Sequence, residues 1–101
     1  MTRKRGKSME YDYATIITKF REKWTRLAEE ADPISAERHA YQEAVQCIDN
    51  ERNERPLQRA FEIAIILMSL TQATSEPEVR KVLRQCARDF NRETGQERWS
   101  F

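Results

Sequence analysis

Four arginines near the C-terminal end of the chain have the most chemically suggestive spacing, because they recur at intervals of four: Arg80, Arg84, Arg88 and Arg92. At about 100° of rotation per residue, a helix would place them along one side, and we name this set the arginine ridge. Like charges four residues apart destabilise a helix by about 0.2–0.5 kcal/mol per pair. Either a neighbouring helix supplies acids to the ridge or the ridge faces water. A ridge in water is a plain solvated surface, or it binds an acidic protein surface or a phosphate backbone.

Both ends of the chain carry residue types that suit recognition. Residues 1–8 form a basic segment that we expect to be a flexible arm, able to follow nucleic-acid phosphates; its basic residues are Arg3, Lys4, Arg5 and Lys7. Residues 96–101 form a short tail with two large aromatic side chains, Trp99 and Phe101. Large exposed aromatic side chains are a liability in a small protein. We therefore expect the tail to fold back onto the domain or to dock on a partner.

No grouping of residue types indicates catalysis, a metal or a cofactor. The single histidine, His39, falls opposite the apolar side of its predicted helix, and it cannot complete a zinc site with Cys47 and Cys86. Both cysteines fall on apolar sides, where a thiol usually behaves as a small buried hydrophobic group; a disulfide or a reactive thiol is the alternative. Glycine-rich phosphate loops are absent, since the two glycines stand alone at positions 6 and 95. We predict a protein that is not an enzyme and has no cofactor.

The composition fits one small domain without a strong overall charge. The 101 residues are 35% charged, yet the net charge is only +1, so no global field draws the chain to nucleic acid or to a membrane. Most of the 18 basic residues are arginines, which favours recognition of carboxylates or phosphates slightly. No apolar run approaches the roughly twenty residues that span a bilayer, and the basic N-terminus lacks the apolar core of a secretory signal. We expect a soluble cytoplasmic protein.

Helical periodicity accounts for nearly the whole chain between its two ends. The predicted helices cover about residues 10–31, 36–50, 57–73 and 76–94. Ser35 is expected to cap the second helix, and Pro56 suits the first turn of the third. Ser75 and Glu78 have the spacing of a capping box at the start of the fourth helix. Gly95 stands where a glycine commonly ends a helix.

The third predicted helix, residues 57–73, is apolar around most of its circumference, and such a helix must be covered on most sides. One seam consists of Leu57, Phe61, Ala64, Met68 and Thr71, and a second consists of Ile63, Ile66 and Leu70. We therefore expect an all-α bundle of four mostly antiparallel helices over residues 9–95, with this helix at its centre. The second seam could instead form the contact of a symmetric homodimer.

These features together predict a small interaction protein. It would be an adaptor, regulator or assembly factor that binds another protein and self-associates. The arginine ridge, Trp99 and Phe101 would bind the partner, and Ile63, Ile66 and Leu70 would form the self-association contact. The alternative is a nucleic-acid-binding accessory protein that uses the basic arm and the arginine ridge.

Overall fold

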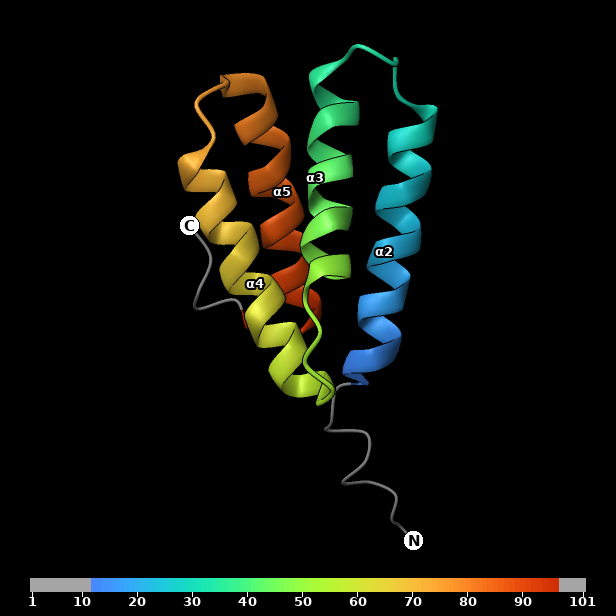
Figure 1. Cartoon of the computed structure of the whole chain (residues 1–101), viewed down its shortest axis with the longest axis vertical. Coiled ribbons are helices and arrows are strands. Elements are labelled where there is room, and N and C mark those ends of the chain that lie inside the picture. The colour runs from blue at the N-terminus through green and yellow to red at the C-terminus, as the bar shows by residue number, and fades with distance from the viewer. Residues whose placement is uncertain (1–11, 97–101) are drawn as a thin grey trace, which may run out of the picture.

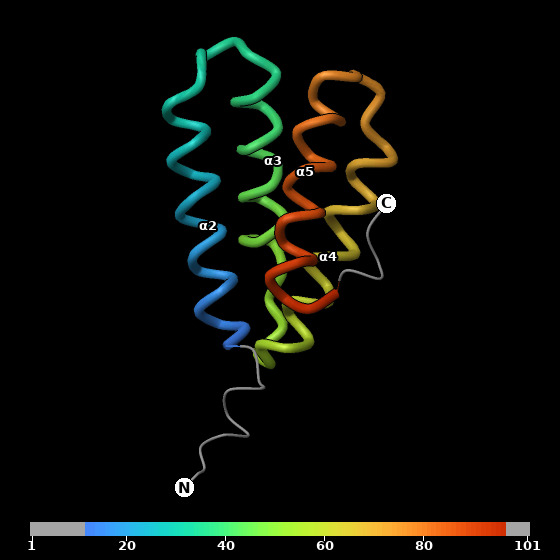
Figure 2. The backbone as a smooth tube through the Cα atoms, turned by 180° about the vertical axis from the view of Figure 1, so that it is seen from behind, coloured from blue at the N-terminus to red at the C-terminus, as the bar shows by residue number. Residues whose placement is uncertain are grey.

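The computed structural model describes residues 12–96 of the chain. In the described region the chain forms four α-helices, in the order α2 (Tyr13–Glu30), α3 (Ala36–Asn50), α4 (Pro56–Ala73) and α5 (Pro77–Glu93), and no strand. Consecutive helices run in opposite directions, with α2 beside α3 and α4 beside α5 (Figures 1 and 2). The predicted all-α bundle of four antiparallel helices is therefore confirmed. The predicted arm, 1–8, and all of the predicted tail except its first residue lie outside the described residues.

The N-terminal caps explain where the helices begin. The Asp12 carboxylate accepts a hydrogen bond from the backbone N–H of Thr15 at 3.2 Å, so α2 begins at Tyr13, three residues after the predicted start. The predicted Ser35 cap is confirmed, since its hydroxyl oxygen accepts from the backbone N–H of Arg38 at 3.1 Å. Pro56 is the first residue of α4, as predicted.

The capping box predicted at the start of α5 is wrong. Glu76 is the N-cap residue, and its side chain makes no capping hydrogen bond. The helix begins at Pro77, because proline lacks an N–H and has a backbone angle that suits the first helical position. This shift by one residue removes Ser75 from the position that it would need to cap the helix.

The C-terminal end of α5 is closed by a glycine, as predicted. Gly95 has a φ angle of 75°, in the left-handed region that favours glycine. Its N–H donates to the carbonyl of Arg92 at 3.3 Å, and the N–H of Gln96 donates to the carbonyl of Asn91 at 2.6 Å. This pair of hydrogen bonds is the Schellman motif, which satisfies carbonyls at a helix end.

Three aromatic side chains join α2 to α5 in the core. The ring centroids of Phe20 and Trp24 are 5.1 Å apart, and those of Phe20 and Phe90 are 5.5 Å apart. These separations lie within the favourable range for aromatic pairs. All three residues are at most 2% exposed, so the apolar sides predicted for the two helices do face the core.

The middle of the bundle is occupied by α3, and the prediction that residues 57–73 form the central helix is not confirmed. Helix α3 packs closely against α2 on one side and α5 on the other, whereas α4 packs mainly on α5 (Figure 1). Ala40 and Ala44 of α3 are fully buried. Their small side chains let the neighbouring backbones approach, so α3 can lie between two helices, and one side of α4 stays uncovered.

Candidate interaction surface

The first residue of the arginine ridge, Arg80, has a role within the chain. Its Nε donates to the backbone carbonyls of Thr74 at 3.0 Å and Thr71 at 3.3 Å, and its Nη2 donates to that of Gln72 at 3.3 Å. These carbonyls lie at the C-terminal end of α4, where helical hydrogen bonding leaves acceptors without partners and the helix dipole favours a cation. Arg80 therefore closes the end of α4.

The other ridge residues follow Arg80 along α5. Arg84 is half-buried and Arg88 is exposed. The Nη1 of Arg92 lies 3.5 Å from the carboxylate of Asp89, one turn before it on the same helix. The structure thus places the four arginines on one side of one helix, although Arg80 is engaged by backbone carbonyls. Binding of an acidic partner by the ridge stays a prediction.

The role of Arg80 is repeated at the connection between α2 and α3. The Nη2 of Arg38, in the first turn of α3, donates to the carbonyls of Glu29 at 3.0 Å and Ala31 at 3.1 Å. These two carbonyls end α2. An arginine in the first turn of α3 therefore closes the helix before it.

The connection between α3 and α4 has the same arrangement. In the first turn of α4, Arg59 donates from Nε to the carbonyl of Glu51 at 3.0 Å and from Nη2 to that of Ile48 at 2.9 Å. At each connection between described helices, an arginine of the following helix thus donates to carbonyls at the end of the preceding one, and we name this arrangement an arginine clamp. Our reading of the sequence missed this role, although an arginine at the third or fourth position of each following helix was a visible signal.

The residues predicted for self-association do not form the open side of α4. Ile63 is fully buried, while Ile66 and Leu70 are half-buried and pack against the chain's own core. The buried side of the helix consists of Ala60, Ile63, Ala64, Leu67 and Thr71. Ile63 is therefore a core residue of the monomer, and self-association through this seam stays a prediction.

The open side of α4 carries a different apolar set, which we name the outer face: Leu57, Ile65 and Met68. Leu57 is 61% exposed, Ile65 is 42% exposed, and Met68 is half-buried. Their helical positions fall within about 80° of one another. Among the described residues, the only other exposed large hydrophobic side chain is Ile34, in the α2–α3 connection. The outer face is therefore the one helix surface in the described region with two exposed large apolar side chains.

The two thiols lie inside the bundle. Burial raises the pKa of Cys47 to about 11 and that of Cys86 to about 12. Because the thiolate is the reactive form, both side chains are poor nucleophiles at neutral pH. They are buried free cysteines, and the prediction that they behave as small hydrophobic groups is confirmed.

The one histidine of the chain lies on the surface of α3. His39 is exposed, and its Nε2 lies 3.8 Å from the Glu43 carboxylate. In residues 12–96, no group of three or more His, Cys, Asp and Glu side chains could hold a metal ion.

A hollow of about 450 Å³ between α3 and α5 is lined by groups of both charges, including Glu78 and Lys81. Tyr41 also lines this hollow, and burial raises its pKa.

The fold and surface of residues 12–96 define a small all-α protein, a four-helix bundle with one partly uncovered apolar helix face. Comparison of the chain with family models, curated proteins and solved structures finds no match. No helix between residues 12 and 96 is long and apolar enough to cross a membrane. The geometry of the chain itself is therefore the basis for interpreting its function.

Proposed function

We propose that this protein is a small cytoplasmic interaction protein that binds another protein through the outer face of α4 and acts as an adaptor, regulator or assembly factor. The observation that supports this proposal is the exposure of Leu57 and Ile65, at 61% and 42%, on one helix. Burial of apolar surface is favourable by about 25 cal/mol per Å². Binding of a partner over this face would therefore be favourable, because it buries apolar surface that is exposed in the isolated chain.

The outer face is a better candidate than the arginine ridge for the centre of an interface. Arg80, the first residue of the ridge, already donates to three carbonyls at the end of α4, so a partner would have to displace these contacts. Protein interfaces have an apolar centre and a polar rim in which arginine is common. The arginine ridge suits a rim, and the outer face suits a centre.

The outer face of α4 is apolar, and this favours a binding role over a catalytic one. An uncovered apolar patch promotes association and supplies no acid, base or nucleophile. The thiols would be the strongest nucleophiles of the chain, but burial raises the pKa of both. These observations support an interaction protein as the leading function.

Site-specific photocrosslinking in the native cell tests the proposal. A photoreactive amino acid replaces Ile65 in one variant and Ile34 in a control, because Ile34 is also apolar and is 94% exposed. We expect a discrete crosslinked protein species from position 65, absent from position 34 and lost when Leu57→Asp is added. Equal crosslinking from both positions, or none from position 65, would contradict the proposal.

A further inference from the structure

We propose that the partner on the outer face of α4 is a second copy of this chain, with the two α4 helices antiparallel across a two-fold axis near Ile65. This inference rests on the proposed function, since it names the partner of the same surface. Residues 56–73 form α4, so Ile65 lies at the middle of the helix. It is also one of the two exposed large hydrophobic side chains of the helix. An axis at this position would bring the two most central exposed apolar side chains together.

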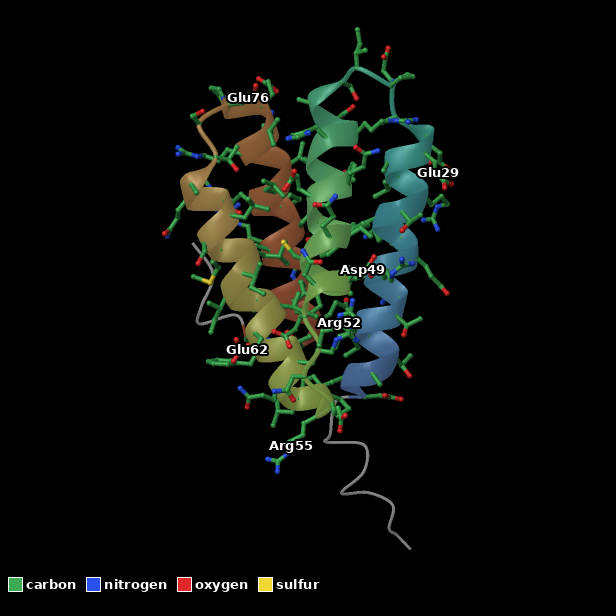
Figure 3. The ribbon with its side chains drawn as sticks, in the orientation of Figure 1. Glu29, Asp49, Arg52, Arg55, Glu62 and Glu76 are labelled. Atoms are coloured by element: carbon green, nitrogen blue, oxygen red, sulfur yellow. The ribbon has the colours of Figure 1, made fainter. Side chains whose placement is uncertain are left out.

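The charges beyond the two ends of α4 are complementary in this arrangement. Arg55 precedes the helix and Glu76 follows it, and Figure 3 shows them at opposite ends of the bundle. Both residues are exposed, and in the described part of the chain neither side chain has a hydrogen-bond or ion-pair partner. They lie ten and eleven residues from Ile65. A two-fold axis at Ile65 therefore brings the Arg55 end of each copy to the Glu76 end of the other.

The antiparallel orientation follows from the same charges. A parallel pair would place the two Arg55 side chains at one end and the two Glu76 side chains at the other, with repulsion at both ends. An antiparallel pair forms two opposite-charge contacts and also opposes the helix dipoles. In this pair the same surface of both copies forms the contact. Such an isologous interface is that of a two-fold dimer, which is the commonest oligomer. The opposite charges that flank α4 therefore fit a second copy in the antiparallel orientation.

The size of the surface sets the expected affinity. A helix of 18 residues is about 27 Å long, and one side of it is about 10 Å wide. Each copy would bury about 270 Å² on this side of α4, or about 540 Å² for the pair, which is less than the roughly 1,000 Å² that a stable interface buries. We therefore expect a weak dimer with a dissociation constant in the micromolar range. The fraction of chains in the dimer should rise with protein concentration.

A charge-swap series measured by sedimentation equilibrium tests the inference on the full chain. We expect wild type to shift from monomer to dimer between low and high micromolar concentration. Arg55→Glu and Glu76→Arg should each raise the dissociation constant by about fivefold, because each variant places like charges together at both ends. The double variant Arg55→Glu/Glu76→Arg should restore the wild-type constant within about twofold.

The apolar centre has its own variant and control. Ile65→Asp should raise the dissociation constant by about tenfold or more, since it buries a charge at the axis. Ile34→Asp, the same kind of change at an exposed site outside α4, should leave the constant unchanged. Thermal unfolding of each variant shows whether it is folded before its mass is interpreted.

The outcomes separate this inference from the proposed function. A strict monomer at high micromolar concentration, or a dimer that Ile65→Asp and the single charge variants leave intact, would overturn the two-fold pairing. Crosslinking from position 65 to a different protein would then leave the proposed function standing. Crosslinking within one chain to residues 97–101 would overturn both, because the chain's own C-terminal segment would cover the outer face.

Discussion

The Nε of Arg80 donates a hydrogen bond to the backbone carbonyl of Thr74 at 3.0 Å, and this contact joins the first turn of α5 to the end of α4. Arg38 and Arg59 make the equivalent contacts at the other two connections. An arginine suits this position because its planar group carries several donors in a fixed geometry and stays charged. The bundle therefore uses three of its arginines to hold successive helices together.

Removal of the Arg80 clamp should destabilise the protein. Hydrogen bonds from charged groups contribute about 1.5–3 kcal/mol, and the Arg80 side chain is only half-exposed. We expect Arg80→Ala to lower the free energy of unfolding by about 1–3 kcal/mol in urea titrations. Lys81→Ala, at the next and exposed position, should change it by less than about 0.5 kcal/mol. Equal effects of the two substitutions would show that the clamp contributes nothing.

An enlarged side chain in α3 should be poorly tolerated, because this helix lies between two others. Ala44 is fully buried where α3 packs on its neighbours. Ala44→Leu should cost about 1–3 kcal/mol of unfolding free energy through overpacking, as measured by urea denaturation. Gln46→Leu, at an exposed position of the same helix, is the matched control and should be nearly neutral. A stable Ala44→Leu variant would mean that α3 is not closely packed.

Low pH should weaken the link between α2 and α3. Arg21 donates from Nε and Nη2 to the two carboxylate oxygens of Asp49, at 2.6 and 3.0 Å, and this lowers the pKa of Asp49. A carboxyl group with a lowered pKa in the folded state stabilises the protein above its unfolded pKa of about 3.9, and this contribution is lost as the pH falls through the folded value. We expect the melting temperature to fall below about pH 4.

Asp49→Asn should make the fall in melting temperature at low pH less steep, because it removes the titrating carboxyl group. The change is expected to be small, since both side chains are nearly half exposed and solvent screens the pair. Glu54 is exposed in the α3–α4 connection, and Glu54→Gln should leave the fall in melting temperature as steep as in wild type. Parallel pH profiles for Asp49→Asn and wild type would rule out a contribution from this pair.

The two thiols should make the protein sensitive to alkali. Burial raises the pKa of Cys47 to about 11 and that of Cys86 to about 12, from the ordinary thiol value of 9.0. Their contribution to stability is complete below the unfolded pKa and is lost as the pH rises through the folded values. We expect slow reaction with a thiol reagent at neutral pH, rapid reaction of both thiols in urea, and a fall in stability above about pH 9.

Replacement of Cys86 by Ala should reduce the slope of stability against pH above about pH 9, whatever its effect on stability at neutral pH. The slope is the useful measure because the smaller side chain also leaves a cavity, which lowers stability at every pH. Rapid labelling of both thiols in the folded protein at neutral pH would contradict the buried positions of Cys47 and Cys86.

The sequence predicted the helices well because their signals are local. The apolar spacing of α2 and α5, the Ser35 cap and the glycine after α5 all depend on residues within one or two turns. The start of α5 was misplaced by one residue, because two local signals competed there. Pro77 determined the outcome, and Ser75 was left outside the helix.

The candidate surface was predicted less well, since it depends on how the helices pack. Apolar residues nearly surround α4, so periodicity alone could not show which side faces the core. Packing turned Ile63 inward and left Ile65 exposed, two residues away on the chain. The clamps depend on contacts between a side chain of one helix and carbonyls of another, which sequence spacing alone does not reveal. Trp99, Phe101 and the basic residues of the N-terminal arm lie outside the described residues, so their roles stay predictions.

Sedimentation of wild type and Ile65→Asp across the same range of micromolar concentrations tests most directly whether α4 pairs with a second copy. We expect the mass of wild type to rise toward that of two chains, while the mass of folded Ile65→Asp stays near that of one. Superimposable curves for the two proteins would contradict it.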